Sequence, residues 1–330
     1  MSNAPVVECV PNFSEGRNPA VIAAIASAIE AVQEVQLLNV DSSADANRTV
    51  MTFLGPPGAV LEAAYSAVDR AGRLIDMSRQ SGEHPRIGAA DVCPFIPWAD
   101  VTMEQCVDLA RELGQRVAGK LGIPVYLYGA AATRTHRREL GNIRKGEYEG
   151  LARKMQDPDW IPDFKADFNP AAGACIIGAR ELLLAYNVNL RSRDIDAARK
   201  IAARIRESGP PVKPARLKAV KALAWYLAQH DCTQISMNLT DTDVTPVHTV
   251  FERINREAEK YRIRVSGSEI VGMVSLKVML ESGRYYGFNG IPSFINDETV
   301  LVRNAVEALG LNDLYDFDPQ NKIIEYKICA

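Results

Sequence analysis

Residues 35–57 read VQLLNVDSSADANRTVMTFLGPP and hold the order of elements that decides the fold. The apolar runs 35–40 and 49–54 are typical of two strands, and the polar segment 41–48 joins them. Pro56 and Pro57 then open a long helix that extends through Met77. This part of the chain is predicted to form two neighbouring strands followed by a helix.

Further elements lie on both sides of this stretch. Upstream, residues 6–10 form an apolar strand, and Asn18 with Pro19 supplies the cap and first turn of a helix. Downstream, residues 92–96 form a fourth strand. The order strand, helix, strand, strand, helix, strand is the split βαβ plan, in which helices cover one face of an antiparallel sheet. A helix at 103–121, a strand at 124–128 and a polar helical stretch near 136–155 extend this half.

The second half of the chain repeats this order. Its strands are predicted at 183–189, 220–227, 233–239 and 263–271, and its helices near 194–206 and at 245–261. We therefore predict an α+β fold of two similar lobes, each a βαββαβ (split βαβ, ferredoxin-like) antiparallel-rich sheet with helices on one face. The lobes are expected at 1–180 and 181–330, with a ligand cleft between them.

Composition excludes several classes of function. The 330 residues include 38 Lys and Arg against 41 Asp and Glu, so the net charge of −3 argues against nucleic acid as the main partner.

The N-terminus lacks the pattern of a signal peptide and no apolar run is long enough to cross a bilayer, so we expect a cytoplasmic protein without membrane contact. The six cysteines are scattered without a Cys-x-x-Cys pair, which predicts reduced thiols and no metal site.

No nucleotide site is expected either. Residues 114–120 have the spacing of a phosphate-binding loop, but Leu121 stands where Ser or Thr should hold the metal, and the segment lies within an amphipathic helix. No Gly-x-Gly-x-x-Gly sequence follows a strand.

The segment SGEHPRIG, residues 81–88, is the first candidate for chemistry. Gly82 and Gly88 allow unusual backbone angles, and Pro85 favours an extended conformation of His84 that projects its ring from the loop. Histidine titrates near neutrality and is the commonest general acid and base. The residues alone leave open whether His84 is catalytic or faces solvent in an ordinary loop.

Other polar segments are weaker candidates. Asp41 could orient a neighbouring imidazole, although segment 41–48 also has the composition of an ordinary polar turn. His248, at the start of a predicted helix, is compatible with a surface position. A basic cluster that surrounds His136 could receive carboxylates or form a solvated helix face; it comprises Arg134, Arg137, Arg138, Arg144 and Lys145.

Several segments together resemble one family. In the first half they are VECVPNFSEG (7–16), NRT (47–49), LIDMSR (74–79), GEHPR (82–86) and DVCPFIP (91–97). In the second half, WYL (225–227), HTV (248–250) and IEY (324–326) continue them. These segments are similar to those of the glutamate formimidoyltransferase family, and the resemblance covers nearly the whole chain.

The resemblance implies a transferase of histidine catabolism and one-carbon metabolism. It moves the formimino group of N-formimino-L-glutamate to N5 of tetrahydrofolate, which serves as co-substrate, without metal or nucleotide. The family's catalytic histidine falls on His84 and its aspartate partner on Asp41. The family's folate-binding stretch falls on Lys165, Ala166, Asp167, Phe168, Asn169, Pro170, Ala171, Ala172, Gly173 and Ala174. The resemblance also suggests a homodimer.

The reaction fits an imidazole that acts as base and then as acid. N5 attacks the amidine carbon and must lose its proton before glutamate can leave; His84 would take that proton and return it to the departing amine, while Asp41 fixes the tautomer. Arg48, Arg86 and the cluster around Arg137 are candidate binders of substrate carboxylates.

Two alternatives stay open. The first is formyl transfer between 5-formyltetrahydrofolate and glutamate, which needs the same acid/base residue. The second is a non-catalytic folate-binding partner of a separate cyclodeaminase. We expect a stand-alone transferase without a cyclodeaminase domain.

Overall fold

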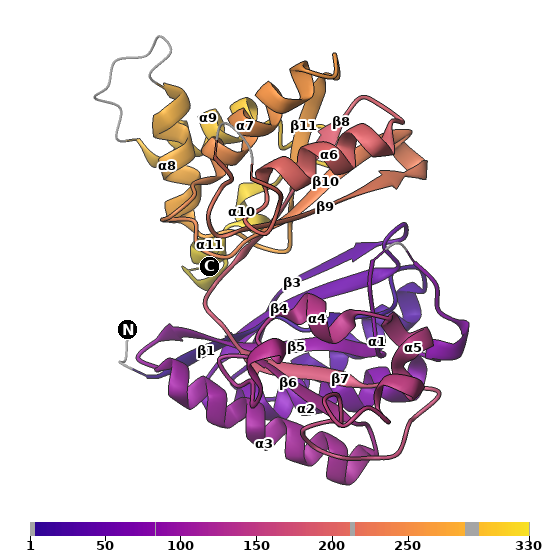
Figure 1. The fold of residues 1–330 in the computed structure, drawn as a ribbon. Helices are drawn as coiled ribbons and strands as arrows, with labels where there is room; N and C mark the ends of the chain where they lie inside the picture. Colours follow the sequence, from indigo (N-terminus) through magenta and orange to yellow (C-terminus); the bar gives the residue numbers. More distant parts are fainter. Residues whose placement is uncertain (1–3, 83, 212–214, 288–296, 330) are drawn as a thin grey trace. The chain divides into compact units, whose positions relative to one another are not determined.

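The computed structural model describes residues 4–82, 84–211, 215–287 and 297–329. The chain folds into two compact units, Met1–Glu181 and Leu182–Ala330. Each unit has its own sheet and its own helices (Figure 1).

The first unit is built on a four-strand antiparallel core in the order β5-β1-β4-β3. Along the chain, its elements are β1 (Val6–Cys9), β2 (Asn12–Phe13), α1 (Pro19–Glu30), β3 (Gln36–Ser43), β4 (Arg48–Gly55), α2 (Pro57–Leu74) and β5 (Ala90–Ala99). Strand β2 continues the line of β1 and pairs with β4 and β5. The predicted βαββαβ order is confirmed for this unit.

Three later elements belong to this unit, and the two strands among them extend the sheet beyond β5. They are α3 (Met103–Leu121), β6 (Val125–Gly129) and β7 (Cys175–Ala179). Strand β7 lies between β5 and β6 and runs parallel to both, so the sheet is mixed rather than wholly antiparallel.

Helices cover both faces of the first sheet. Apolar side chains of alternate strand residues, such as Cys9, Phe53 and Phe95, belong to one core with residues of α1, α2 and α3. A smaller core forms at the other face, where Tyr126 and Ile176 join the two short helices α4 (Leu140–Arg144) and α5 (Glu147–Lys154). This second layer places charged side chains from α4 and α5 near the start of β5.

The second unit has the same topology. Its βαββαβ elements are β8 (Leu184–Leu190), α6 (Ile195–Ile205), β9 (Val220–Leu227), β10 (Cys232–Leu239), α7 (Val247–Glu259) and β11 (Val265–Val271). The sheet is antiparallel with the order β11-β8-β10-β9, which corresponds to the order of the first unit's core. Its remaining helices are α8 (Leu276–Gly287), α9 (Glu298–Leu309), α10 (Pro319–Lys322) and α11 (Ile324–Cys329).

Two local predictions need correction. The expected helical stretch near 136–155 is divided into a 3-10 turn (Thr135–Arg137), α4 and α5, because Gly146 has a positive φ of 91° that ends one helix before the next begins. Asp41 does not lie in a turn, because β3 continues through Ser43 and pairs Asp41 with Val50 of β4.

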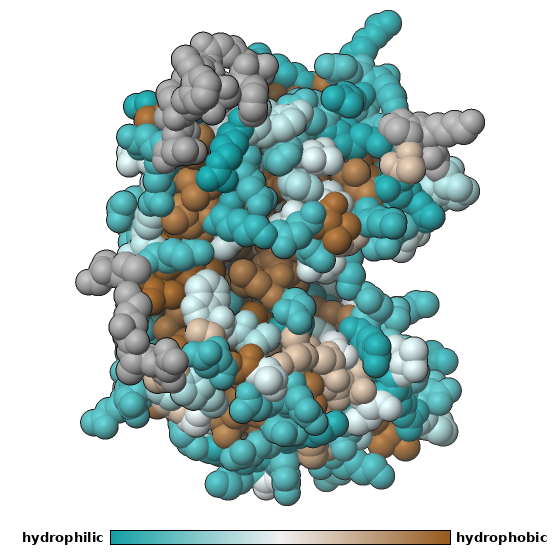
Figure 2. Space-filling model, turned by 90° about the vertical axis from the view of Figure 1, so that its left-hand side faces the viewer, coloured by the Kyte–Doolittle hydropathy of each residue, from teal (hydrophilic) through white to brown (hydrophobic). Residues whose placement is uncertain are grey.

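The surface is mainly polar on the face drawn in Figure 2, where hydrophilic side chains predominate. Large apolar side chains that are exposed come from separate places in the chain, such as Val40 of β3, Leu223 of β9 and Tyr315 of the loop between α9 and α10. In the described part of the chain, every helix is too short or too polar to span a membrane.

Candidate functional site

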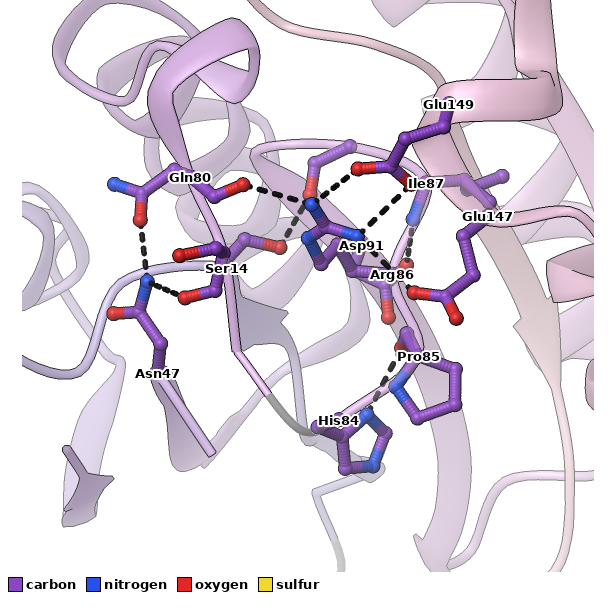
Figure 3. A network of polar contacts seen from close by, with 12 residues as sticks. Ser14, Asn47, Gln80, His84, Pro85, Arg86, Ile87, Asp91, Glu147 and Glu149 are labelled. Carbon is purple, nitrogen blue, oxygen red and sulfur yellow. Dashed lines mark hydrogen bonds and ion pairs between the residues drawn. The ribbon is translucent and has the colours of Figure 1, made fainter. Parts of the chain in front are cut away.

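His84 lies in the segment that leads from the 3-10 turn Met77–Arg79 to β5. Its ring is half-buried, and Nδ1 lies 2.9 Å from the Pro85 carbonyl oxygen and 2.9 Å from Nη1 of Arg48. Figure 3 shows the ring at the edge of a dense polar network, with Nδ1 directed at Pro85. Glu83, the preceding residue of the family-like motif, lies outside the described residues.

The two contacts at Nδ1 require different tautomers. A carbonyl oxygen only accepts and a guanidinium only donates. With the proton on Nδ1, the ring donates to Pro85 and Nε2 keeps the lone pair; with the proton on Nε2, Nδ1 accepts from Arg48. Both tautomers are neutral imidazoles, and each retains one basic nitrogen.

Arg48 links His84 to a buried carboxylate. It is the first residue of β4 and only 5% exposed; Nε donates to Oδ1 of Asn12 at 2.8 Å, and Nη2 donates to Oδ2 of Asp91 at 2.6 Å. Asp91 is wholly buried near the start of β5, and Arg144 of α4 contacts the same oxygen at 2.6 Å. The backbone N–H of Ile87 donates to the other oxygen of Asp91. The His84 segment, two strands and one helix therefore meet at a single carboxylate.

These charges set the protonation states of the site. Burial lowers the pKa of His84 well below its ordinary value, and the cations Arg48 and Arg144 lower it further. Burial alone would raise the pKa of Asp91, but the two arginines outweigh it and hold this pKa at about 2. At neutral pH the site contains an uncharged imidazole, two guanidiniums and one carboxylate.

Arg86 anchors the His84 segment to α5. Its guanidinium forms ion pairs with Glu147 at 3.1 Å and Glu149 at 2.7 Å, and it donates to the Gln80 carbonyl at 2.7 Å. Figure 3 shows Arg86 between these groups, turned away from the His84 ring. Its carboxylate partners are already present, so the arrangement favours a structural role over substrate binding.

The expected folate-binding stretch, residues 165–174, lies against the His84 segment. Ala174 donates to the Ile87 carbonyl at 3.0 Å, and Ala89 donates to the Ala172 carbonyl at 2.9 Å. Gly88 and Gly173 form an isolated β-bridge between the two segments. Lys165 and Asp167 are exposed, whereas Ala172, Gly173 and Ala174 are buried. The structure thus joins the end of this stretch to the loop that carries His84.

Gly173 is required by this contact. Its φ is +68°, and a Cβ built there would lie 2.2 Å from the Ile87 carbonyl oxygen and 2.8 Å from the Cα of Gly88. A side chain at residue 173 would therefore separate the two segments.

Asp41 shares one sheet face with part of this site. It lies opposite Val50 of β4, which in turn lies opposite Asn12 of β2. Since opposed residues of neighbouring strands point to the same face, Asp41 projects from the face that carries Asn12, the acceptor of the Arg48 Nε–H. A direct pairing of Asp41 with His84 stays a prediction.

The other candidates have local structural partners. Arg137 is wholly buried, pairs with Asp163 at 2.8 Å and donates to two backbone carbonyls of the segment 159–161. His136 packs edge-on against Trp160. His248 belongs to the second unit, where it stacks on Tyr285 with ring centroids 4.2 Å apart. Arg137, His136 and His248 therefore each have a structural partner within their own unit.

A search of the described residues finds no group of three or more His, Cys, Asp and Glu side chains that could hold a metal ion. Five cysteines are free and buried: Cys9, Cys93, Cys106, Cys175 and Cys232. The phosphate-loop spacing at 114–120 lies within α3.

Sequence reasoning missed the role of Asp91 and singled out Arg144 only as part of a basic cluster. A usable signal was present for Asp91, since it is the one acidic residue in the otherwise apolar ADVCPFIPWA strand. A carboxylate in a buried strand needs cationic partners. The partners themselves lie 43 and 53 residues away, which no local pattern indicates.

Comparisons with known proteins identify the family of the chain. The family model of the formiminotransferase domain, N-terminal subdomain, matches residues 6–180, and that of the formiminotransferase domain matches residues 185–329. A formimidoyltransferase-cyclodeaminase from Gallus gallus is 47% identical over 99% of this chain and 60% of its own length. Glutamate formimidoyltransferases from Thermoplasma acidophilum and Streptococcus pyogenes are 44% and 40% identical; the matches cover 85% and 86% of this chain and 92% and 93% of theirs. The chain therefore spans about 60% of the cyclodeaminase-containing relatives and nearly all of the two shorter ones.

Proposed function

This chain belongs to the formiminotransferase family, and from that premise we propose that it transfers the formimino group of N-formimino-L-glutamate to N5 of tetrahydrofolate. The products are 5-formiminotetrahydrofolate and L-glutamate. The observation that carries the proposal is the position of His84, whose ring lies 2.9 Å from Arg48 in a loop that is hydrogen-bonded to the end of the stretch 165–174.

The reaction needs one group that first accepts and then donates a proton. N5 adds to the carbon of the protonated amidine, the electron pair of its C=N bond moves to the terminal nitrogen, and N5 becomes positively charged; His84 then removes the N5 proton through its basic ring nitrogen. The resulting imidazolium donates that proton to the nitrogen of the glutamate portion. The bond from this nitrogen to carbon breaks as the terminal nitrogen re-forms the C=N bond, and glutamate leaves as a neutral amine. His84 ends in its starting state, so the cycle is balanced.

The surroundings of His84 suit this sequence of steps. A depressed pKa keeps the imidazole uncharged and ready to accept a proton when substrate binds. The same depressed pKa makes the imidazolium a strong acid toward the departing amine. We further propose that Asp41 selects the reactive tautomer and stabilises the imidazolium, and that residues 165–174 bind the folate.

The direct test mixes the protein with tetrahydrofolate and N-formimino-L-glutamate and follows folate absorbance together with glutamate release. Equal amounts of 5-formiminotetrahydrofolate and glutamate are expected. A second reaction with 5-formyltetrahydrofolate and glutamate tests formyl transfer. If folate binds and neither reaction turns over, the protein is instead the non-catalytic folate-binding partner of a cyclodeaminase.

Three further features stay predictions: a homodimer, a cytoplasmic location and a ligand cleft between the lobes. Light scattering of the purified protein tests the first, localisation of the tagged protein in its cells of origin the second, and a folate-bound crystal structure the third.

A further inference from the structure

The cluster at Asp91 contains more positive than negative charge. Arg48 and Arg144 both contact Oδ2 of Asp91 at 2.6 Å, and the side chains of the three residues are 6%, 12% and 0% exposed. His84, the fourth member, is held neutral by its surroundings. Two guanidiniums share one carboxylate, so one positive charge in a poorly solvated place remains without a counter-ion among the described residues.

The donors of Arg48 are already engaged. Its Nε binds Asn12, its Nη1 lies at His84 and its Nη2 binds Asp91. Arg86, the next cation along this segment, carries its own two carboxylates, Glu147 and Glu149. Neither residue is arranged to receive a further anion.

Arg144 differs from both. Asp91 is the one partner that its side chain has in the described part of the chain, through Nη2. Its Nε is buried and lacks a hydrogen-bond acceptor there. Arg86 and Arg137 also have a buried Nε without an acceptor, but their charges are matched by carboxylates of their own. Among the described cations of this site, Arg48, Arg86 and Arg144, only Arg144 has both a donor without an acceptor and no carboxylate of its own. A carboxylate of the ligand would supply an acceptor for the donor and a counter-ion for the charge.

We propose that Arg144 binds the α-carboxylate of the formimino donor and that Asp91 positions Arg144 for this contact. The inference rests on the proposed function and names the group by which the donor is recognised. In N-formimino-L-glutamate, the α-carboxylate is attached to the carbon that bears the formimino nitrogen. It is therefore the anion closest to the group on which His84 acts. The carboxylates of the folate lie beyond its benzoyl group, far from N5.

The chain of contacts from His84 matches this placement. His84 meets Arg48, Arg48 meets Asp91, and Asp91 meets Arg144, with each step between 2.6 and 2.9 Å. Arg144 therefore belongs to the same contact network as the imidazole, which is where the donor must bind for His84 to act on it.

The test compares three donors: N-formimino-L-glutamate, its α-carboxamide analogue and its γ-carboxamide analogue. Arg144→Gln should lower kcat/KM by roughly 10- to 100-fold for the first and third, because a charge-assisted contact is lost. The α-carboxamide should be a poor substrate of the unaltered protein and should lose far less than the natural donor in the variant. The KM for tetrahydrofolate should not change.

Two further variants keep the test decisive. Arg144→Lys retains the charge but not the fork of donors, so it should show a smaller loss with the same dependence on the α-carboxylate, even if Arg144→Gln folds poorly. Arg153→Gln, at an exposed arginine of α5, should behave as the unaltered protein. Thermal unfolding of each variant reports on folding.

The proposal is overturned if Arg144→Gln lowers kcat/KM for the α-carboxamide as strongly as for the natural donor. It is also overturned if the γ-carboxamide is the donor whose kcat/KM the variant leaves unchanged, or if only the KM for tetrahydrofolate rises. An unaltered protein that transfers no formimino group overturns the proposed function itself. An active protein that is insensitive to Arg144→Gln overturns this inference alone.

Discussion

The protonation state of His84 is decided by its neighbours. An isolated histidine is partly charged near neutrality, whereas this ring is half-buried and close to Arg48 and Arg144. The Coulomb repulsion between an imidazolium and two guanidiniums is strong in a poorly solvated place. Burial and the two arginines thus favour the neutral form of the imidazole, and Asp91 moderates the effect of the arginines because it contacts both.

Replacing His84 with Ala tests its assignment as the acid/base residue. Turnover should fall by roughly 10²- to 10⁴-fold, the usual range for the loss of a general acid/base group. The affinity for tetrahydrofolate should change far less, because the ring is assigned to proton transfer. Steady-state kinetics and equilibrium folate binding measure the two effects. Near-normal turnover, or a loss of activity that arises only from failed folate binding or folding, would make the assignment wrong and His248 the next candidate.

Asp41→Asn should resemble His84→Ala in kind. The amide retains the size of the carboxylate but cannot support a charged imidazolium, so kcat should decrease while the protein remains folded. The matched change Asp45→Asn alters a carboxylate of the neighbouring turn and should have no such effect. Equal kinetics for the two variants would contradict a role for Asp41.

The depressed pKa of His84 also makes a prediction about stability and pH. The unfolded chain takes up a proton near the ordinary histidine pKa of 6.5, whereas the folded chain resists protonation. The free energy of unfolding should therefore decrease as the pH falls from 6.5 through the lower pKa of the folded state. Urea unfolding of the protein and of His84→Gln over this range measures the contribution, and the variant should show a smaller slope. Burial also lowers the pKa of His248, so the His84→Gln variant should keep the part of the pH dependence that comes from His248.

At the scale of elements, the sequence predicts what depends on neighbouring residues and misses what depends on tertiary contacts. Helix α3 has the predicted bounds, because Thr102 and Gln105 form a capping box at its start and Gly122 takes a left-handed conformation at its end. The strand position of Asp41 was missed because Asp and Ser favour turns, and pairing with β4 overrides that preference. The joining of residues 87–89 to 172–174 depends on chain segments far apart in sequence, so the two candidate segments were found separately but their contact was not.

A pair of glycine substitutions tests the importance of that contact. Gly173 and Gly122 both have positive φ, +68° and +63°, but a Cβ at residue 122 meets open space. Gly122→Ala should cost roughly 1–2 kcal/mol of unfolding free energy from backbone strain alone, without loss of kcat/KM. Gly173→Ala adds a collision with the Ile87 carbonyl and should impair both stability and turnover. Urea unfolding measures the stability of the two variants, and steady-state kinetics measure their turnover. If both variants lost the same stability and kept the same turnover, the contact between residues 87–89 and 172–174 would not support the site.

At the scale of the whole molecule, the repeated topology was predictable and the site was only partly so. Both units have the βαββαβ order, which the alternation of apolar runs and caps along the chain indicates. The family-like motifs located His84 and the stretch 165–174. They did not show that Asp91 draws Arg48 and Arg144 together, because a shared buried carboxylate is a property of three segments in space.

Independence from metal and nucleotide is the last prediction. In the proposed mechanism, one proton moves from N5 to the departing amine through His84, and arginines supply the positive charge that anionic groups need. A divalent cation next to Arg48 and Arg144 would be repelled by them. Dialysis against a chelator should therefore leave kcat and both KM values unchanged, and added Mg²⁺, Zn²⁺ or ATP should not raise them. As a control, a metal-dependent hydrolase treated in the same buffer should lose its activity. If chelation abolished formimino transfer and a divalent ion restored it, His84 and the arginines would be insufficient for the chemistry and the mechanism would need a metal-bound step.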